Sequence, residues 1–169
     1  MKILFENWRK FVNEVKELIC PPATQDLKLN TENRDIAVQA EHVQYGPLNV
    51  DEPGDYWQRI AHAWNTTEEA ARQSLCGNCV AFDISPRMKD CMPGETSDQD
   101  GELGYCWMHH FKCHSVRSCR TWAKGGPISE DEKSAEWQGK SNLEEVADDN
   151  LDKKYKPLTD SIPFIPVSY

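Results

Sequence analysis

The cysteines are the residues of this chain whose number and spacing most clearly predict chemistry. Six of them occur within 44 residues, namely Cys76, Cys79, Cys91, Cys106, Cys113 and Cys119. The first two form a C-x-x-C pair, whose spacing lets two thiolates converge on one metal ion or cluster. This crowding predicts a cysteine-ligated metal site with the six residues as candidate ligands. Cys20 stands apart beside Pro21, and we expect it to be a buried or free thiol.

Three chemistries could use these thiols. A dithiol redox site places its C-x-x-C pair at the start of a helix in a βαβ pattern, whereas here a helical pattern precedes the pair. Zinc is the alternative, because His109 or His114 could complete a tetrahedral set with the thiolates. The cysteines after Cys79 are separated by eleven, fourteen, six and five residues, which is not the spacing of zinc knuckles. One iron–sulfur cluster is therefore the first hypothesis.

Large aromatic residues alternate with the cysteines, and they are Phe82, Tyr105, Trp107, Phe111 and Trp122. Burial and limited hydrogen bonding to sulfur are among the factors that set the potential of a cluster. We therefore expect Phe82, Tyr105, Trp107 and Trp122 to surround the cofactor. The same aromatic residues could simply form the core of a small domain, and the two roles are compatible.

The order of these motifs resembles that of high-potential iron–sulfur proteins. The C-G-N-C segment is followed by Phe82, then by a Cys-Met-Pro-Gly segment at Cys91, and then by Gly-Tyr-Cys-Trp around Cys106. The resemblance covers about residues 55–125 and implies one [4Fe–4S] cluster and one-electron transfer. It implies four ligands, which are Cys76, Cys79, Cys91 and Cys106.

A second alignment of the same motifs gives a different ligand set. The segment Cys119-Arg120-Thr121-Trp122 resembles the Cys-x-x-Trp ending of that family. It implies Cys76, Cys79, Cys106 and Cys119 as the ligands. The first set is preferred because both the Pro-Gly and the Gly-Tyr pairs match.

The start of the chain carries a further resemblance. Its segment Phe5-Glu6-Asn7-Trp8-Arg9-Lys10-Phe11 is similar to N-terminal segments of proteins encoded by tailed bacteriophages of marine bacteria. This likeness implies that the metal site serves the architecture of a phage-encoded protein, in the host cytoplasm or in the virion.

Composition limits the classes of protein that the chain can belong to. Its 169 residues are enough for one core with appendages, and only 38% of them are hydrophobic. The net charge of −9 argues against nucleic-acid binding, which requires clustered Lys and Arg. We find no apolar stretch long enough for a signal peptide or a membrane span, so we expect a reducing cytoplasm and no membrane partner.

The elements that must position the cysteines follow from periodicity and capping patterns. A helix is expected from about Asp55, and Thr66 with Glu69 resembles a capping box that begins another. Ser129 with Glu132 predicts a third start, and Trp137 is the apolar anchor of that stretch. We expect a small, irregular α+β fold with short helices around a metal-centred core and little regular sheet. The expected division is an amphipathic helix at 1–20, an irregular connection at 21–54, a cysteine-rich metal-binding domain at 55–126 and an acidic, proline-containing tail at 127–169.

Two functions follow from this sequence. The first is a [4Fe–4S] protein that carries single electrons to a redox partner protein. The alternative is a structural or interaction protein whose zinc or iron–sulfur site only stabilises the fold and which binds a partner through its appendages. No nucleophile and base are spaced as a catalytic pair, so we do not expect an enzyme.

Overall fold

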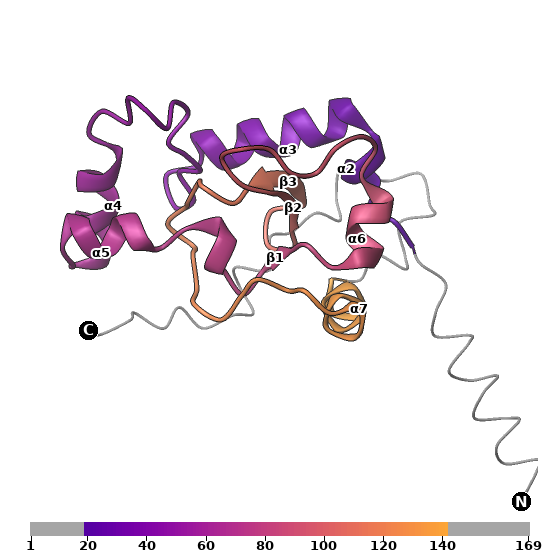
Figure 1. The fold of residues 1–169 in the computed structure, drawn as a ribbon. Helices are drawn as coiled ribbons and strands as arrows, with labels where there is room; N and C mark the ends of the chain where they lie inside the picture. Colours follow the sequence, from indigo (N-terminus) through magenta and orange to yellow (C-terminus); the bar gives the residue numbers. More distant parts are fainter. Residues whose placement is uncertain (1–18, 142–169) are drawn as a thin grey trace, which may run out of the picture.

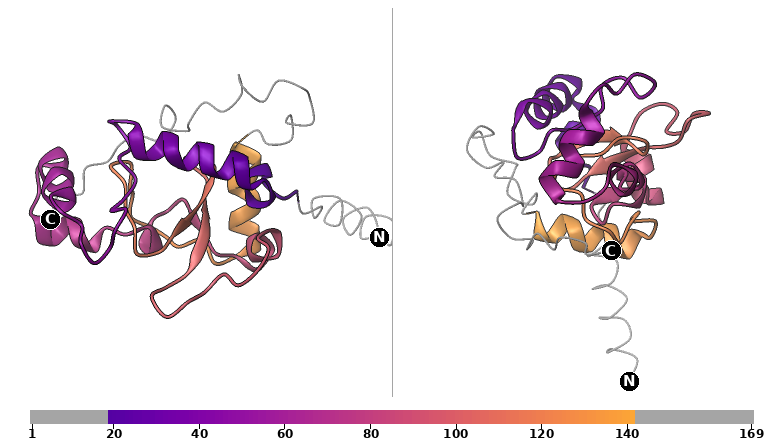
Figure 2. Two further views of the ribbon diagram at one scale, coloured as in Figure 1. Left: turned by 90° about the horizontal axis from the view of Figure 1, so that it is seen from above. Right: turned by 90° about the vertical axis from the view of Figure 1, so that its left-hand side faces the viewer.

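The structure is a computed structural model that describes residues 19–141. Within this range the chain forms six short α-helices and one three-stranded antiparallel sheet, which confirms the expected α+β class. Figures 1 and 2 show helices α3 and α7 on opposite sides of the sheet, with α4 and α5 at one end. The predicted N-terminal helix, except its last two residues, and the tail beyond 141 lie outside the described residues.

The sheet is small, as expected, and two cysteines lie on it. Its strands are β1 (Phe82–Asp83), β2 (Leu103–Cys106) and β3 (Phe111–His114), in the order β1-β2-β3. Gly104 lies opposite Cys113, and Cys106 lies opposite Phe111. A Cβ on Gly104 would lie only 2.5 Å from the ring of Phe82. A side chain at this position would therefore separate β1 from β2.

The stretch 21–54 is not irregular throughout, and this prediction was wrong. It contains α2 (Pro22–Gln25) and the 13-residue helix α3 (Leu27–Gln39), whose first turn is capped by the carboxylate of Asp26. Two amides of α3 bind the sheet region: Asn30 accepts a hydrogen bond from the backbone N–H of Lys112, and Asn33 donates one to His110 O, both at 2.7 Å. Because this face is attached by amides, α3 lacks the apolar period that reveals most helices.

Helices α4 (Tyr56–Trp64) and α5 (Glu68–Gln73) confirm the two helices predicted before the cysteine segment. Asp55 precedes α4 as expected, while the residue that caps α5 is Thr67 rather than Thr66. The pair has its own small core, formed by Tyr56, Trp57, Ile60, Ala61 and Ala71. A 3₁₀ turn, η1 (Cys76–Asn78), then leads into the sheet.

Helices α6 (Pro86–Cys91) and α7 (Asp131–Lys140) pack against each other beyond the sheet. The carboxylate of Asp131 accepts a hydrogen bond of 2.9 Å from the backbone N–H of Arg87, whose guanidinium contacts Gln138. Trp137 is buried, which confirms it as the anchor of α7, although the helix begins after Glu130 without a side-chain cap. None of the helices described within 19–141 is long and apolar enough to cross a membrane.

Candidate metal centre

All seven cysteines lie in or against the main core, and five of them share a further property. These are Cys76, Cys79, Cys106, Cys113 and Cys119, and all five are free thiols. Cys119 interacts electrostatically with Cys76, Cys79 and Cys106. Cys113 interacts through its side chain with Cys76 and Cys106. The five thiols therefore form one group, which we call the thiol cluster.

The backbone brings these thiols together from separate segments. Cys106 ends β2 and Cys113 lies on β3, so the hairpin supplies two of them. The η1 turn binds the loop that follows β3, because Cys76 N–H donates a hydrogen bond of 2.6 Å to Arg117 O. The backbone of Cys79 pairs with that of Lys124 in an isolated bridge. Segments more than forty residues apart in the sequence thus meet at the thiol cluster.

Asn78 is the residue that joins the C-x-x-C turn to the loop of Cys119. Its Oδ1 accepts hydrogen bonds from Leu75 N–H at 3.1 Å and from Trp122 Nε1 at 2.8 Å. Its Nδ2 donates to Gln73 O at 2.8 Å. Trp122 therefore has a positioning role that sequence reasoning did not assign to it. The place of Asn78 inside C-G-N-C was the only signal in the sequence for this contact.

The thiols differ in how easily they lose a proton. Burial raises the pKa of Cys79 to about 12, against the opposing effect of the N–H groups of Ala123 and Ala81. Burial and the neighbouring thiols raise the pKa values of Cys113 and Cys119 well above their usual range. Only the pKa of Cys106 is lowered, first by the Cys113 thiol and also by nearby backbone N–H groups. Burial therefore opposes the loss of a proton from three of the five thiols.

The predicted aromatic residues pack in the same core as the thiols. Phe82, Tyr105 and Trp107 are at most 2% exposed, and Trp122 is 8% exposed. Trp107 Nε1 donates a hydrogen bond of 2.8 Å to the buried carboxylate of Asp83, and its ring meets that of Tyr105 edge to face. Sequence reasoning missed Asp83, which is fully buried.

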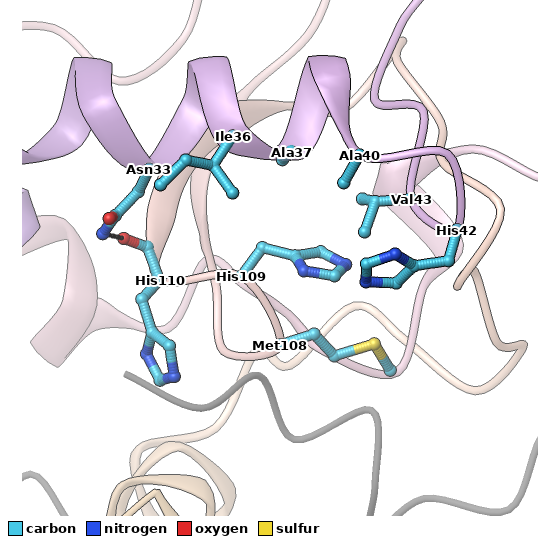
Figure 3. Close-up of a pocket in the computed structure, with 9 residues that line it drawn as sticks. All are labelled: Asn33, Ile36, Ala37, Ala40, His42, Val43, Met108, His109 and His110. Carbon is cyan, nitrogen blue, oxygen red and sulfur yellow. Dashed lines mark hydrogen bonds between the residues drawn. The ribbon is translucent and has the colours of Figure 1, made fainter. Parts of the chain in front are cut away.

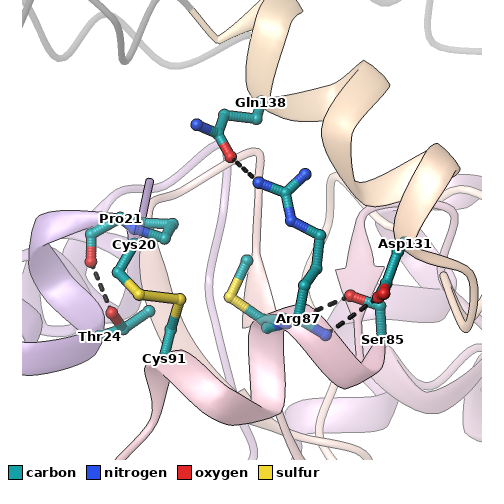
Figure 4. Close-up of a disulfide and its surroundings, with 9 residues drawn as sticks. Cys20, Pro21, Thr24, Ser85, Arg87, Cys91, Asp131 and Gln138 are labelled. Atoms are coloured by element: carbon teal, nitrogen blue, oxygen red, sulfur yellow. Dashed lines mark hydrogen bonds between the residues drawn. A yellow bond between two sulfur atoms is a disulfide. The ribbon is translucent and has the colours of Figure 1, made fainter. Parts of the chain in front are cut away.

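Cys91 lies outside the thiol cluster. It ends α6 and forms a disulfide with Cys20, with their Cα atoms 5.3 Å apart (Figure 4). The prediction of a buried or free thiol at Cys20 was therefore wrong. The preferred ligand set also included Cys91, whose sulfur is not available as a thiolate in this bond. The start of α2 meets the end of α6 only through tertiary folding, so the spacing of the cysteines gave no sign of this pair.

The histidines that kept zinc as an alternative have other partners. His109 Nε2 lies 2.6 Å from Thr121 Oγ1, and His114 Nε2 lies 3.3 Å from Asp98 Oδ2. Among residues 19–141, no three His, Cys, Asp or Glu side chains are arranged to hold a metal ion. A single zinc requires its ligands to converge at about 2.0–2.3 Å. A cluster distributes its thiolates over several iron atoms. Thiolates are donors for both zinc and iron–sulfur clusters, so the donor set fits either group.

Comparison with protein-family models, curated proteins and solved structures gave no match. The likeness to high-potential iron–sulfur proteins and to phage proteins therefore stays a prediction from motifs alone.

Proposed function

We propose that this chain binds one iron–sulfur cluster through Cys76, Cys79, Cys106 and Cys119. The observation that carries the proposal is a group of five free thiols, four of them buried, that come from separate segments and interact with one another. A buried cysteine usually packs singly, as a small apolar side chain. Five free thiols in one core are better explained by a shared ligand for their sulfur atoms.

The choice of four ligands follows from the place of each thiol. Cys76 and Cys79 form the C-x-x-C turn, and Cys106 and Cys119 lie in the Gly-Tyr-Cys and Cys-x-x-Trp motifs. Cys113 belongs to neither motif, and its side chain interacts with those of Cys106 and Cys76. We therefore assign Cys113 as a neighbour of the ligands.

Backbone donors reach the sulfur atoms of two proposed ligands. N–H groups of Ala81 and Ala123 act on the Cys79 sulfur, and those of Met108 and His109 act on the Cys106 sulfur. Hydrogen bonds to the ligand sulfurs are one of the means by which proteins set the potential of an iron–sulfur cluster. When bound, the cluster would supply one-electron transfer. The chain would hold the cluster, exclude water from it and bind a redox partner protein.

The same placement favours a second function, in which the cluster stabilises the fold. The strands are only two to four residues long, and the ligands come from η1, β2 and the loop beyond β3. A small core of this kind gains stability from a metal staple. A cluster that binds but does not change oxidation state at an accessible potential would select this structural role over electron transfer.

The first experiment is anaerobic purification, followed by an absorption spectrum and analysis of iron, sulfide and zinc. We expect a coloured protein that contains iron and acid-labile sulfide. A colourless protein with one zinc per chain would overturn the proposal.

Single serine variants test the ligand set. We expect Cys76→Ser, Cys79→Ser, Cys106→Ser and Cys119→Ser to lose iron, while Cys113→Ser keeps it. The matched control is Cys91→Ser, which removes a buried cysteine outside the thiol cluster and should also keep iron. Loss of iron from Cys91→Ser but not from Cys119→Ser would restore the first ligand set.

A cytoplasmic location is part of this proposal, because the five free thiols require reducing conditions. The Cys20–Cys91 disulfide is of a kind that is rare in that compartment. Trapping the thiols with an alkylating reagent in intact cells, followed by mass analysis, would give the state of each cysteine. Oxidation of the five core thiols to disulfides in the cell would contradict the proposed location.

A further inference from the structure

One threonine hydroxyl connects a proposed ligand to a histidine. Thr121 Oγ1 lies 3.1 Å from Cys119 Sγ and 2.6 Å from His109 Nε2. Both distances allow hydrogen bonds, with the wider limit that sulfur permits. The three residues come from two segments, since His109 follows β2 and the other two lie in the Cys-x-x-Trp motif.

The chemistry of the three groups gives the bonds a direction. A hydroxyl has one proton to donate, and a thiolate can only accept. With Cys119 as a thiolate, Thr121 therefore donates to its sulfur, and the oxygen of Thr121 accepts a hydrogen bond from His109 Nε2–H. His109 then carries a proton on Nε2.

The surroundings of His109 hold its ring in place. Figure 3 shows the ring in a pocket between the end of α3 and the turn after β2, facing His42. The other residues on the pocket wall are mostly apolar, and they include Ala37, Ala40, Val43 and Met108. Packing in this pocket thus keeps the imidazole beside the hydroxyl of Thr121.

We propose that Thr121 is a positioning residue for the cluster ligand Cys119, and that His109 orients its hydroxyl. The inference rests on the proposed function, because it needs Cys119 to hold iron. The O–H···S bond fixes the direction of the ligand sulfur and withdraws charge from it. Reduction adds negative charge to a cluster, so such a bond favours the reduced state and raises the potential.

The test compares the reduction potentials of three loaded proteins by anaerobic redox titration. Thr121→Val removes the hydroxyl at nearly constant volume, and Thr121→Ser keeps it. We expect the valine variant to have a more negative potential than the wild type and the serine variant to stay close to the wild type. The iron–sulfur stretching bands in resonance Raman spectra should shift in the valine variant alone.

A variant of His109, the other partner of the Thr121 hydroxyl, provides a second test. His109→Leu keeps the Thr121 hydroxyl but removes the group that orients it, so we expect a smaller shift in the same direction. If Thr121→Val does not load iron, this variant and Thr121→Ser decide the outcome. Equal potentials in all loaded variants would overturn the inference and leave the proposed function intact. A wild-type protein without iron would overturn both.

The protonation of His109 gives a readout that does not depend on redox titration. Nitrogen NMR of the ¹⁵N-labelled wild-type protein with its cluster should find the proton of His109 on Nε2. A proton on Nδ1 would overturn the inference, because Nε2 would then accept the only proton that Thr121 can donate.

Discussion

The Cys20–Cys91 disulfide joins residues that are 71 positions apart, and its removal has a magnitude that follows from this separation. Closing a loop of this length lowers the entropy of the unfolded chain by an amount worth about 4 kcal/mol at 25 °C. That is a large share of the roughly 5–15 kcal/mol by which a typical domain is stable. We therefore expect Cys20→Ala combined with Cys91→Ala to lower the free energy of unfolding by about 4 kcal/mol.

Equilibrium urea unfolding, followed by tryptophan fluorescence, measures this difference. The wild-type protein is compared with the double variant, and each is measured with and without a reductant under anaerobic conditions. Reductant should destabilise the wild type by the same amount and leave the double variant unchanged. The reduced wild type controls for the side-chain substitutions themselves, because Cys91 is buried.

A loss below about 1 kcal/mol would refute the reasoning, since it would mean that the unfolded chain gains little freedom when the bond is absent. A reductant effect of full size in the double variant would refute it in another way. The stability would then depend on the redox state of the thiol cluster and not on this bond.

Three further predictions concern the core. Trp107→Phe should leave the buried carboxylate of Asp83 without its 2.8 Å partner and lower the free energy of unfolding by about 3 kcal/mol; a loss in urea unfolding below about 1 kcal/mol would contradict this. Asn78→Ala removes three hydrogen bonds of the amide, although Trp122 Nε1 keeps Leu75 O as a second acceptor at 2.9 Å, and it should lower the stability by about 2 kcal/mol. Asn78→Asp keeps an acceptor oxygen and should lose less in the same assay. Burial lowers the pKa of His110 to about 4, below its value in the unfolded chain. Its contribution to stability is therefore complete above about pH 6.5 and falls as the pH drops toward about 4, and urea unfolding across this range should show a shallower fall for His110→Asn. Asparagine is the matched choice because it tolerates the positive φ of 55° at this position, and an equal fall in both proteins would contradict the assignment.

The parts of the fold that could be predicted are those where a local pattern decides the structure. Helix α4 has apolar residues at helical spacing, and Trp137 is the large apolar residue of α7; both predictions were confirmed. Helix α3 could not be predicted in this way, because Asn30 and Asn33 attach it to the sheet region by hydrogen bonds. A contact face that combines two amides with few apolar side chains leaves only a weak hydrophobic period in the sequence.

The candidate site, too, could be predicted only in part. The density of cysteines and the aromatic residues between them already indicated a cysteine-rich core, and the structure places five of the thiols there. The sequence could not separate Cys91 from the others, because its partner Cys20 is distant along the chain. Spacing along the chain carries no information on which sulfur atoms meet after folding.

By itself, the sequence determined the chemistry that is available, namely clustered thiols, aromatic neighbours, a small apolar content and short helices. Only the tertiary structure decided which thiols share one place, that Cys91 leaves them for a disulfide, and that Thr121 lies between Cys119 and His109. The physical reason is that residue types and short-range periods act within a few positions, whereas contacts between sulfur atoms depend on how distant segments pack.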